Sequence, residues 1–154
     1  MSRFEPEEVE AVLAHELGHH VAGDVWRGLA VQGAVPLAAF WVADRALAAG
    51  AGALGLSGPA DIAGLPLLGL VAMAVSLIAL PVTNGWSRRV ETRADDFALS
   101  FTRAPGSIIG AMERPASLNL AERDPHFLKE LLLYSHPPAG RRIDRGRNRA
   151  WSEG

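Results

Sequence analysis

Three histidines and a glutamate lie close together in the stretch AHELGHH, from Ala14 to His20. His15 and His19 are four residues apart, which on a helix places both imidazoles on one face, where they can hold one metal ion. Glu16 lies beside them, placed to accept the proton of a water molecule that the metal activates. His20 projects about 100° away from His19, so we do not expect it to join His15 as a ligand.

This spacing is the HExxH pattern, in which zinc metallopeptidases bind zinc with both histidines and use the glutamate as general base. Zinc lowers the pKa of its water to about 7, which prepares that water to attack a peptide carbonyl. The pattern also arises by chance on a helix rich in glutamate, so a polar patch on an ordinary helix stays an alternative. The chain has no cysteine, and the remaining zinc ligand must therefore be His, Asp or Glu.

Glu91 and Asp95 are the residues that can supply the missing half of the site. They are four residues apart in a helical pattern and share one face. Glu91 can complete the zinc coordination, and Asp95 can accept the second N–H of a zinc-binding histidine and so fix its tautomer. The alternative is a solvated acidic face paired with nearby arginines, which are Arg88, Arg89 and Arg93.

Two amphipathic helices are predicted to carry these residues. The first covers residues 2–24, with Pro6 in its first turn and an apolar stripe at helical spacing. The second covers residues 87–103, and a short third helix is expected at residues 125–134. The segment 144–154 is polar and predicted to be a loose tail.

The segment between the two site helices predicts a transmembrane hairpin over residues 28–83. Residues 62–83 carry no charge, and residues 28–43 are apolar except for Gln32. A helix of about 20 apolar residues spans a bilayer core, and the first run reaches that length if it continues past Asp44. The turn is expected at residues 56–61. The alternative is a pair of buried core helices, which a chain this short has little protein to cover.

Aromatic and basic residues flank the hairpin unevenly. Trp26 and Arg27 precede it and Trp86 with two arginines follows it, whereas the other end has Trp41 and Arg45. By the positive-inside rule the arginine-rich end faces the cytoplasm. The hairpin returns the chain to the face that it left, so the helices with His15 and Glu91 can meet there.

Length and charge narrow the class of protein further. The chain of 154 residues is long enough for one domain, 1–154, with the hairpin inside it. Its formal net charge is −2, so nothing indicates a nucleic-acid partner. We expect membrane lipid and a peptide or protein substrate as partners instead.

Three blocks occur in register along the chain: AVLAHELGHH, SRRVETRADDFA and YSHPPAGRRI, with the two apolar runs between the first two. This arrangement resembles the membrane zinc metallopeptidases that comprise the CAAX prenyl endopeptidases and the HtpX-type quality-control proteases. The second and third blocks are closer to the CAAX branch. The resemblance covers residues 6–143 and implies an all-α fold, in which an HExxH helix and an ExxxD helix flank the inserted transmembrane hairpin.

The resemblance implies one zinc ion per chain, bound by His15, His19 and Glu91. Glu16 would be the general base, and Asp95 would support a zinc-binding histidine. Each of these assignments rests on the position of the residue within the matching blocks.

His136 and Arg142 match a histidine and an arginine that lie near the catalytic centre of the family. His136 would donate a hydrogen bond to the oxyanion of the tetrahedral intermediate. Arg142 would pair with a carboxylate such as Asp95 or orient a substrate carbonyl. Both roles come from the resemblance, because SHPP by itself predicts only a turn.

The predicted activity is peptide-bond hydrolysis at the cytoplasmic face of a membrane, the plasma membrane if the source is a bacterium. Family members carry further transmembrane helices upstream of HExxH, so we expect this chain to be the carboxy-terminal catalytic part of a longer protein. The alternatives are an HtpX-type quality-control protease and a non-catalytic membrane module that zinc stabilises.

Overall fold

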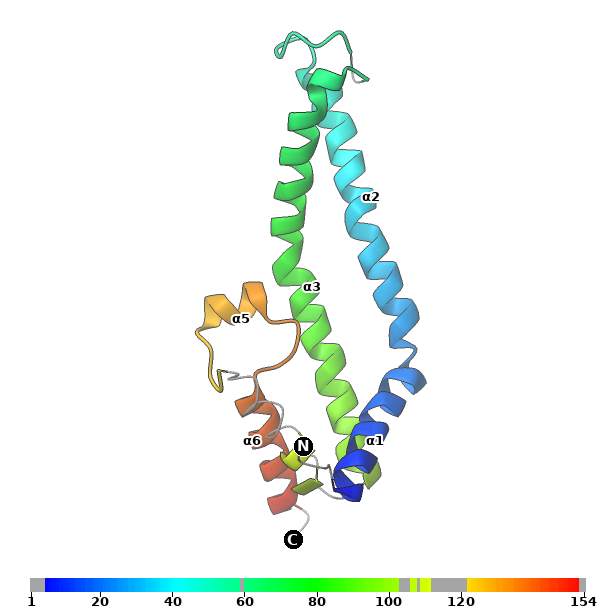
Figure 1. The fold of residues 1–154 in the computed structure, drawn as a ribbon, viewed down its shortest axis with the longest axis vertical. Helices are drawn as coiled ribbons and strands as arrows, with labels where there is room; N and C mark the ends of the chain where they lie inside the picture. The colour runs from blue at the N-terminus through cyan, green and yellow to red at the C-terminus, as the bar shows by residue number, and fades with distance from the viewer. Residues whose placement is uncertain (1–4, 59, 103–105, 108, 112–121, 153–154) are drawn as a thin grey trace. The chain divides into compact units, whose positions relative to one another are not determined.

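The computed structural model describes residues 5–58, 60–102, 106–107, 109–111 and 122–152. The described elements are helical: α1 (Pro6–Ala22), α2 (Asp24–Gly50), the 3₁₀ turn η1 (Ile62–Gly64), α3 (Leu65–Thr102), α5 (Phe127–Leu133) and α6 (Ala139–Ser152). The predicted all-α class is confirmed (Figure 1). The chain divides into two compact units, Trp26–Thr83 and the remainder, Met1–Val25 with Asn84–Gly154.

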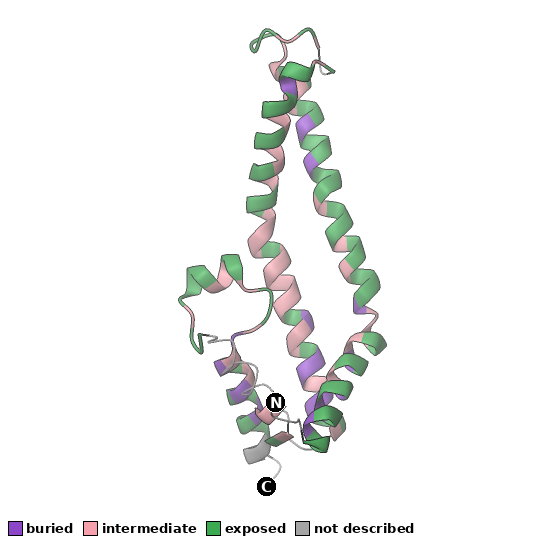
Figure 2. Ribbon diagram, in the orientation of Figure 1, coloured by how far each residue is buried: buried purple, intermediate pink, exposed green. Residues whose placement is uncertain are grey.

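The unit Trp26–Thr83 is a helical hairpin. α2 continues past Asp44 to Gly50, and the connection closes where Asp61 accepts hydrogen bonds from Ser57 and from the backbone of Ala63. Both helices are long and apolar enough to cross a membrane, and none of the most apolar window of either is buried. Figure 2 shows mostly exposed and half-buried residues along them. The alternative of two buried core helices is therefore wrong for this unit.

The other unit is built on the packing of α1 against the last turns of α3. Its buried apolar cluster consists of Ala11 and Ala14 on α1 with Ala98 and Leu99 on α3. A Cβ added to Gly18 would lie 3.2 Å from Phe97 and 3.3 Å from the backbone of Ala94. The two helices therefore approach closely because the residues between them are small, and the close approach brings the side chains of α1 to those of α3.

The predicted apolar stripe of α1 is exposed, although the helix itself is confirmed. Val9, Val12, Leu13 and Leu17 are between 41% and 63% exposed. The helix begins with Pro6 and with a hydrogen bond of 2.9 Å from the Glu5 N–H to the carboxylate of Glu8. The hydrophobic spacing thus predicted the helix correctly, but it did not predict which face of α1 packs against α3.

Two expected boundaries differ from the structure. The helix predicted at residues 87–103 is the end of α3, which continues without interruption from the apolar run. The prediction of a loose tail at 144–154 is wrong as far as Ser152, because α6 extends to that residue. Arg145 of α6 donates to Asp96 of α3 over 2.6 and 2.8 Å, and Ile143 is buried. These contacts hold the polar segment in a helix.

Candidate metal centre

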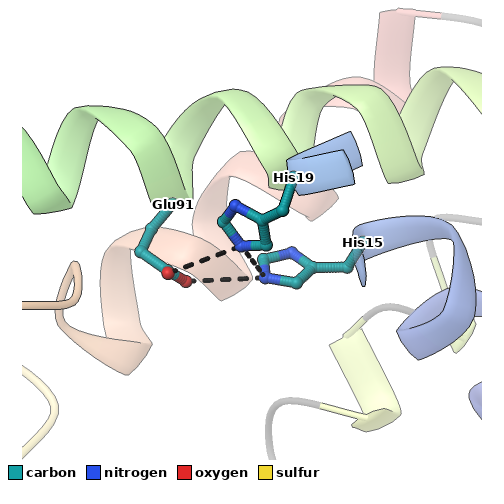
Figure 3. A group of neighbouring side chains, drawn as sticks. All are labelled: His15, His19 and Glu91. Carbon is teal, nitrogen blue, oxygen red and sulfur yellow. Dashed lines mark hydrogen bonds and ion pairs between the residues drawn. The ribbon is translucent and has the colours of Figure 1, made fainter. Parts of the chain in front are cut away.

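Three side chains of the unit Met1–Val25 with Asn84–Gly154 form the candidate metal centre. His15 and His19 lie one helical turn apart on α1, and Glu91 lies on α3 facing them (Figure 3). The two histidine Nε2 atoms are 3.1 Å apart. Each lies 3.5 Å from an oxygen of Glu91, His15 from Oε2 and His19 from Oε1. The two imidazoles and the carboxylate therefore point at one small volume.

The spacing of these atoms fits a zinc ion. In a tetrahedral site with Zn–N and Zn–O bonds of about 2 Å, two ligand atoms lie about 3.3 Å apart. One donor atom from each residue lies within 4.8 Å of the others, and the group has three members in the described part of the chain. Two imidazoles and a carboxylate, with one position left for water or substrate, are a ligand set typical of catalytic zinc.

Asp95 contacts the ring nitrogen of His15 that faces away from the donor group. Its Oδ1 lies 3.0 Å from His15 Nδ1. This ring nitrogen is buried and has no other hydrogen-bond partner among the described residues. Arg142 of α6 holds the carboxylate with two hydrogen bonds, from Nε to Oδ2 at 2.8 Å and from its terminal nitrogen to Oδ1 at 2.6 Å. Arg142 thus fixes Asp95, and Asp95 orients the imidazole of His15.

The charges around His15 favour a cation at this point. Burial lowers the pKa of His15, but the carboxylates of Asp95 and Glu91 outweigh burial and raise it from 6.5 to about 9. Burial likewise opposes ionisation of Asp95, and its contacts with His15 and Arg142 nevertheless hold its pKa below the usual range. A metal ion that binds His15 must therefore displace a tightly held proton, and the carboxylates that hold this proton also attract the metal cation that replaces it.

Asp24 supports His19 in the same way, and sequence reasoning missed it. Its Oδ2 lies 3.0 Å from His19 Nδ1, its side chain is 7% exposed, and Arg93 of α3 donates to its other oxygen. The chain turns between α1 and α2 at Gly23, whose φ of 67° is in the left-handed region. The signal in the sequence was a carboxylate just after the glycine that ends the HExxH helix.

We expect Asp24→Ala to weaken zinc binding by about 10- to 100-fold, the usual cost of losing an outer partner of a metal ligand. The imidazole of His19 would lose its orienting acceptor, while the three donors remain. The measurement is zinc affinity by competition with a chelating dye, with helix content by circular dichroism as a check on folding. Asp44→Ala is the matched control, since Asp44 is exposed and pairs with its neighbour Arg45. Equal affinities in the two variants would contradict this role.

The other predicted residues fall at different distances from the donor group. His136 Nε2 lies 3.5 Å from Glu91 Oε1, and Ser135 Oγ lies 3.0 Å from His136 Nδ1. The His136 side chain is 62% exposed, so a substrate can reach its ring. Glu16 follows His15 on α1, is exposed and has no hydrogen bond or ion pair within the described ranges. His20 is also exposed.

Two of the three arginines near Glu91 have other acidic partners, and no ion pair joins the third, Arg89, to Glu91 in the described part of the chain. The alternative of a solvated acidic face paired with arginines therefore does not describe this site. Arg93 pairs with Asp24, and Arg88 pairs with Glu130 of α5. The Glu91 side chain is 13% exposed, and its carboxylate lies 3.5 Å from ring nitrogens of His15, His19 and His136. The structure therefore directs this carboxylate toward three imidazoles from two parts of the sequence.

The three side chains are a group that could hold a metal ion, formed between two helices in the described, helical part of the chain. Residues 1–150 match the model of peptidase family M48. The chain is 31% identical to an uncharacterized metalloprotease, YhfN, of Bacillus subtilis (strain 168) over 93% of its length. It is 34% identical to the protease HtpX of Pseudomonas entomophila (strain L48) and 31% identical to that of Pseudomonas syringae pv. syringae (strain B728a), each over 97% of its length.

The chain therefore belongs to peptidase family M48. It spans 34% of the length of the Bacillus relative and 55% of the length of the two Pseudomonas relatives. The family membership agrees with the resemblance expected from the three sequence blocks.

Proposed function

We propose that this chain is the catalytic part of a membrane-anchored, zinc-dependent endopeptidase. The observation that carries the proposal is the convergence of His15, His19 and Glu91 on one small volume. Glu16 directly follows His15 in the sequence. A non-catalytic zinc module would close the ion with a fourth protein ligand. The donor group has three members among the described residues, which favours catalysis.

When bound, zinc would act as a Lewis acid that activates a water molecule and polarises the scissile carbonyl. Glu16 accepts the proton of the attacking water and returns it to the leaving amine, since its carboxylate is exposed and unpartnered within the described ranges. His136 donates a hydrogen bond to the oxygen of the carbonyl as negative charge develops there. Asp95 and Asp24 hold the two imidazoles in their binding orientation.

The hairpin anchors this site to a membrane in the proposal, with the site on the cytoplasmic side. Support comes from the exposed apolar surfaces of α2 and α3 and from the arginines at the site end of the hairpin. We further propose that the upstream part of a longer protein adds transmembrane helices beside the hairpin. The exposed apolar stripe of α1 provides a surface for such a partner.

The substrate class has two candidates within the family. The SRRVETRADDFA and YSHPPAGRRI blocks favour a CAAX prenyl endopeptidase. The protease HtpX relatives, similar over nearly the whole chain, favour a quality-control protease that needs no prenyl group. We propose the second, because that similarity extends over the hairpin as well as the site blocks.

The test uses the full chain reconstituted with zinc in lipid vesicles and incubated with a proteome-derived peptide library. Mass spectrometry should detect new peptide ends, which disappear when zinc is chelated and return when stoichiometric zinc is added. A farnesylated peptide and its unprenylated twin form a second pair, and we expect equal cleavage of both. Cleavage that persists without zinc would refute the metal mechanism, and strict dependence on the farnesyl group would favour the CAAX class.

A further inference from the structure

The short helix α5 exposes an apolar surface that no other described element covers. Its sequence is FLKELLL, and none of its seven residues is buried. The side chains of Phe127, Leu128, Leu132 and Leu133 are between 42% and 71% exposed. Exposing apolar side chains to water is unfavourable, and an exposed cluster of this kind marks a surface that contacts a partner or a membrane.

Contacts to α3 fix the position of α5 along this helix, the longest of the described ones. Asn84 Nδ2 donates to the Leu132 carbonyl over 2.8 Å. One turn later, Arg88 donates to the carbonyls of Glu130 and Tyr134 over 3.0 and 2.5 Å. Asn84 directly follows the uncharged run that ends at Thr83. Since that run is the proposed membrane span, α5 is bound to the turn of α3 that leaves the membrane, and Figure 1 shows α5 beside α3.

The surface next to α5 is strongly basic. Five arginines and two acidic residues, Asp95 and Glu130, line a groove beside α5 and α6. Four of these arginines have acidic partners: Arg88 and Arg141 pair with Glu130, Arg142 with Asp95, and Arg145 with Asp96. Arg89, exposed at the same turn of α3, has no acidic partner among the described residues. A guanidinium at this level complements the phosphate of an anionic lipid headgroup.

We propose that α5 lies in the surface of the lipid bilayer, with its apolar side chains among the acyl chains and the arginine groove against anionic headgroups. The proposal rests on the membrane anchoring proposed above. Lys129 carries the one cationic side chain of α5 and pairs with Glu122 in the structure, and its long stem would allow its ammonium group to reach the headgroups at a membrane. His136 follows α5 by three residues, so the seated helix would hold this histidine and the metal centre at the membrane surface. The substrate bond would then be cleaved close to the bilayer.

The absence of cysteine allows a direct test, because a single introduced cysteine gives a unique spin label. Phe127→Cys and Leu133→Cys report on α5 in the full chain, reconstituted in vesicles of phosphatidylcholine and phosphatidylglycerol. Leu77→Cys, in the uncharged run, is the lipid reference, and Asp144→Cys, on an exposed position of α6, is the water reference. The quantity measured is the ratio of label accessibility to oxygen, which concentrates in lipid, over a water-soluble nickel chelate.

We expect the ratio at 127 and 133 to exceed the ratio at 144 and to approach the ratio at 77. The proposal is wrong if the label at position 77 reports lipid while the labels at 127 and 133 either match the label at 144 or are shielded from both reagents. In that case α5 faces water or protein, and the membrane span still stands. If 77 itself reports water, the anchoring fails and takes the α5 proposal with it. Zinc affinity of the same variants is measured separately, so failure of the metal centre is distinguishable from either result.

Discussion

Replacing Glu16 with glutamine lowers kcat for peptide cleavage by about 10²- to 10⁴-fold, the range expected for loss of a general base, and leaves zinc bound. Glutamine has the shape of glutamate but cannot accept the proton of the attacking water. Glu16 has no hydrogen bond or ion pair within the described ranges, so the substitution breaks no contact of the fold. The proposed zinc ligands His15 and His19 stay in place, because Asp95 and Asp24 orient them independently of Glu16.

The measurement combines kcat on a cleaved peptide from the library with zinc stoichiometry by elemental analysis. Glu10→Gln is the control, since Glu10 is an exposed glutamate on the same helix, outside the donor group. It removes the same charge from α1, so a long-range effect of charge would appear in both variants. Normal turnover by the Glu16 variant would contradict the proposed mechanism.

The sequence predicted the halves of this site because each half is local. A spacing of four residues on a helix puts His15 with His19 on one face, and the same spacing puts Glu91 with Asp95 on one face. The structure places these two faces against each other, with Glu91 toward both imidazoles. The apolar runs between them are visible in composition alone. The boundaries of the hairpin unit, Trp26–Thr83, therefore agree closely with the predicted range of residues 28–83.

The supporting contacts could not be predicted in the same way, because they depend on how the helices pack. Asp24 reaches His19 only because Gly23 adopts a left-handed conformation that ends α1 and lets α2 begin at once. Arg93, which holds Asp24, is 69 positions away in the sequence. A search for ion pairs at helical spacing would have assigned this arginine to an acidic residue on its own helix.

Burial was the least predictable property of α1. Hydrophobic spacing assigns the packed face to its large side chains, but the structure packs Ala11, Ala14 and Gly18 against α3 and exposes the valines and leucines. Small residues permit a close approach of the two backbones, as in helices that associate within membranes. That approach allows the histidines of α1 to reach a glutamate on α3. The site therefore depends on the packing of small residues, which hydrophobic spacing did not predict.

Replacing Glu91 with alanine should weaken zinc binding by more than the roughly 10- to 100-fold that follows the loss of an outer partner. The substitution removes one of three donors and leaves two imidazoles, a set below the three protein ligands of a catalytic zinc site. It also removes one of the two carboxylates that raise the pKa of His15, so this histidine would bind its proton less tightly. The lower pKa alone would favour metal binding near neutral pH. It would therefore offset part of the decrease in zinc affinity that the loss of the ligand causes.

The experiment measures zinc stoichiometry after gel filtration and zinc affinity by chelator competition, on Glu91→Ala and on Glu91→Gln. Glutamine keeps the volume of the side chain but is a poor zinc ligand, so a loss in both variants assigns the effect to the carboxylate rather than to a cavity. Asp96→Ala is the control on the same helix, because Asp96 lies outside the donor group and pairs with Arg145. Stoichiometric zinc with unchanged affinity in both Glu91 variants would remove this residue from the site. The donor group would then reduce to two histidines, and the case for a catalytic ion on this chain would fail.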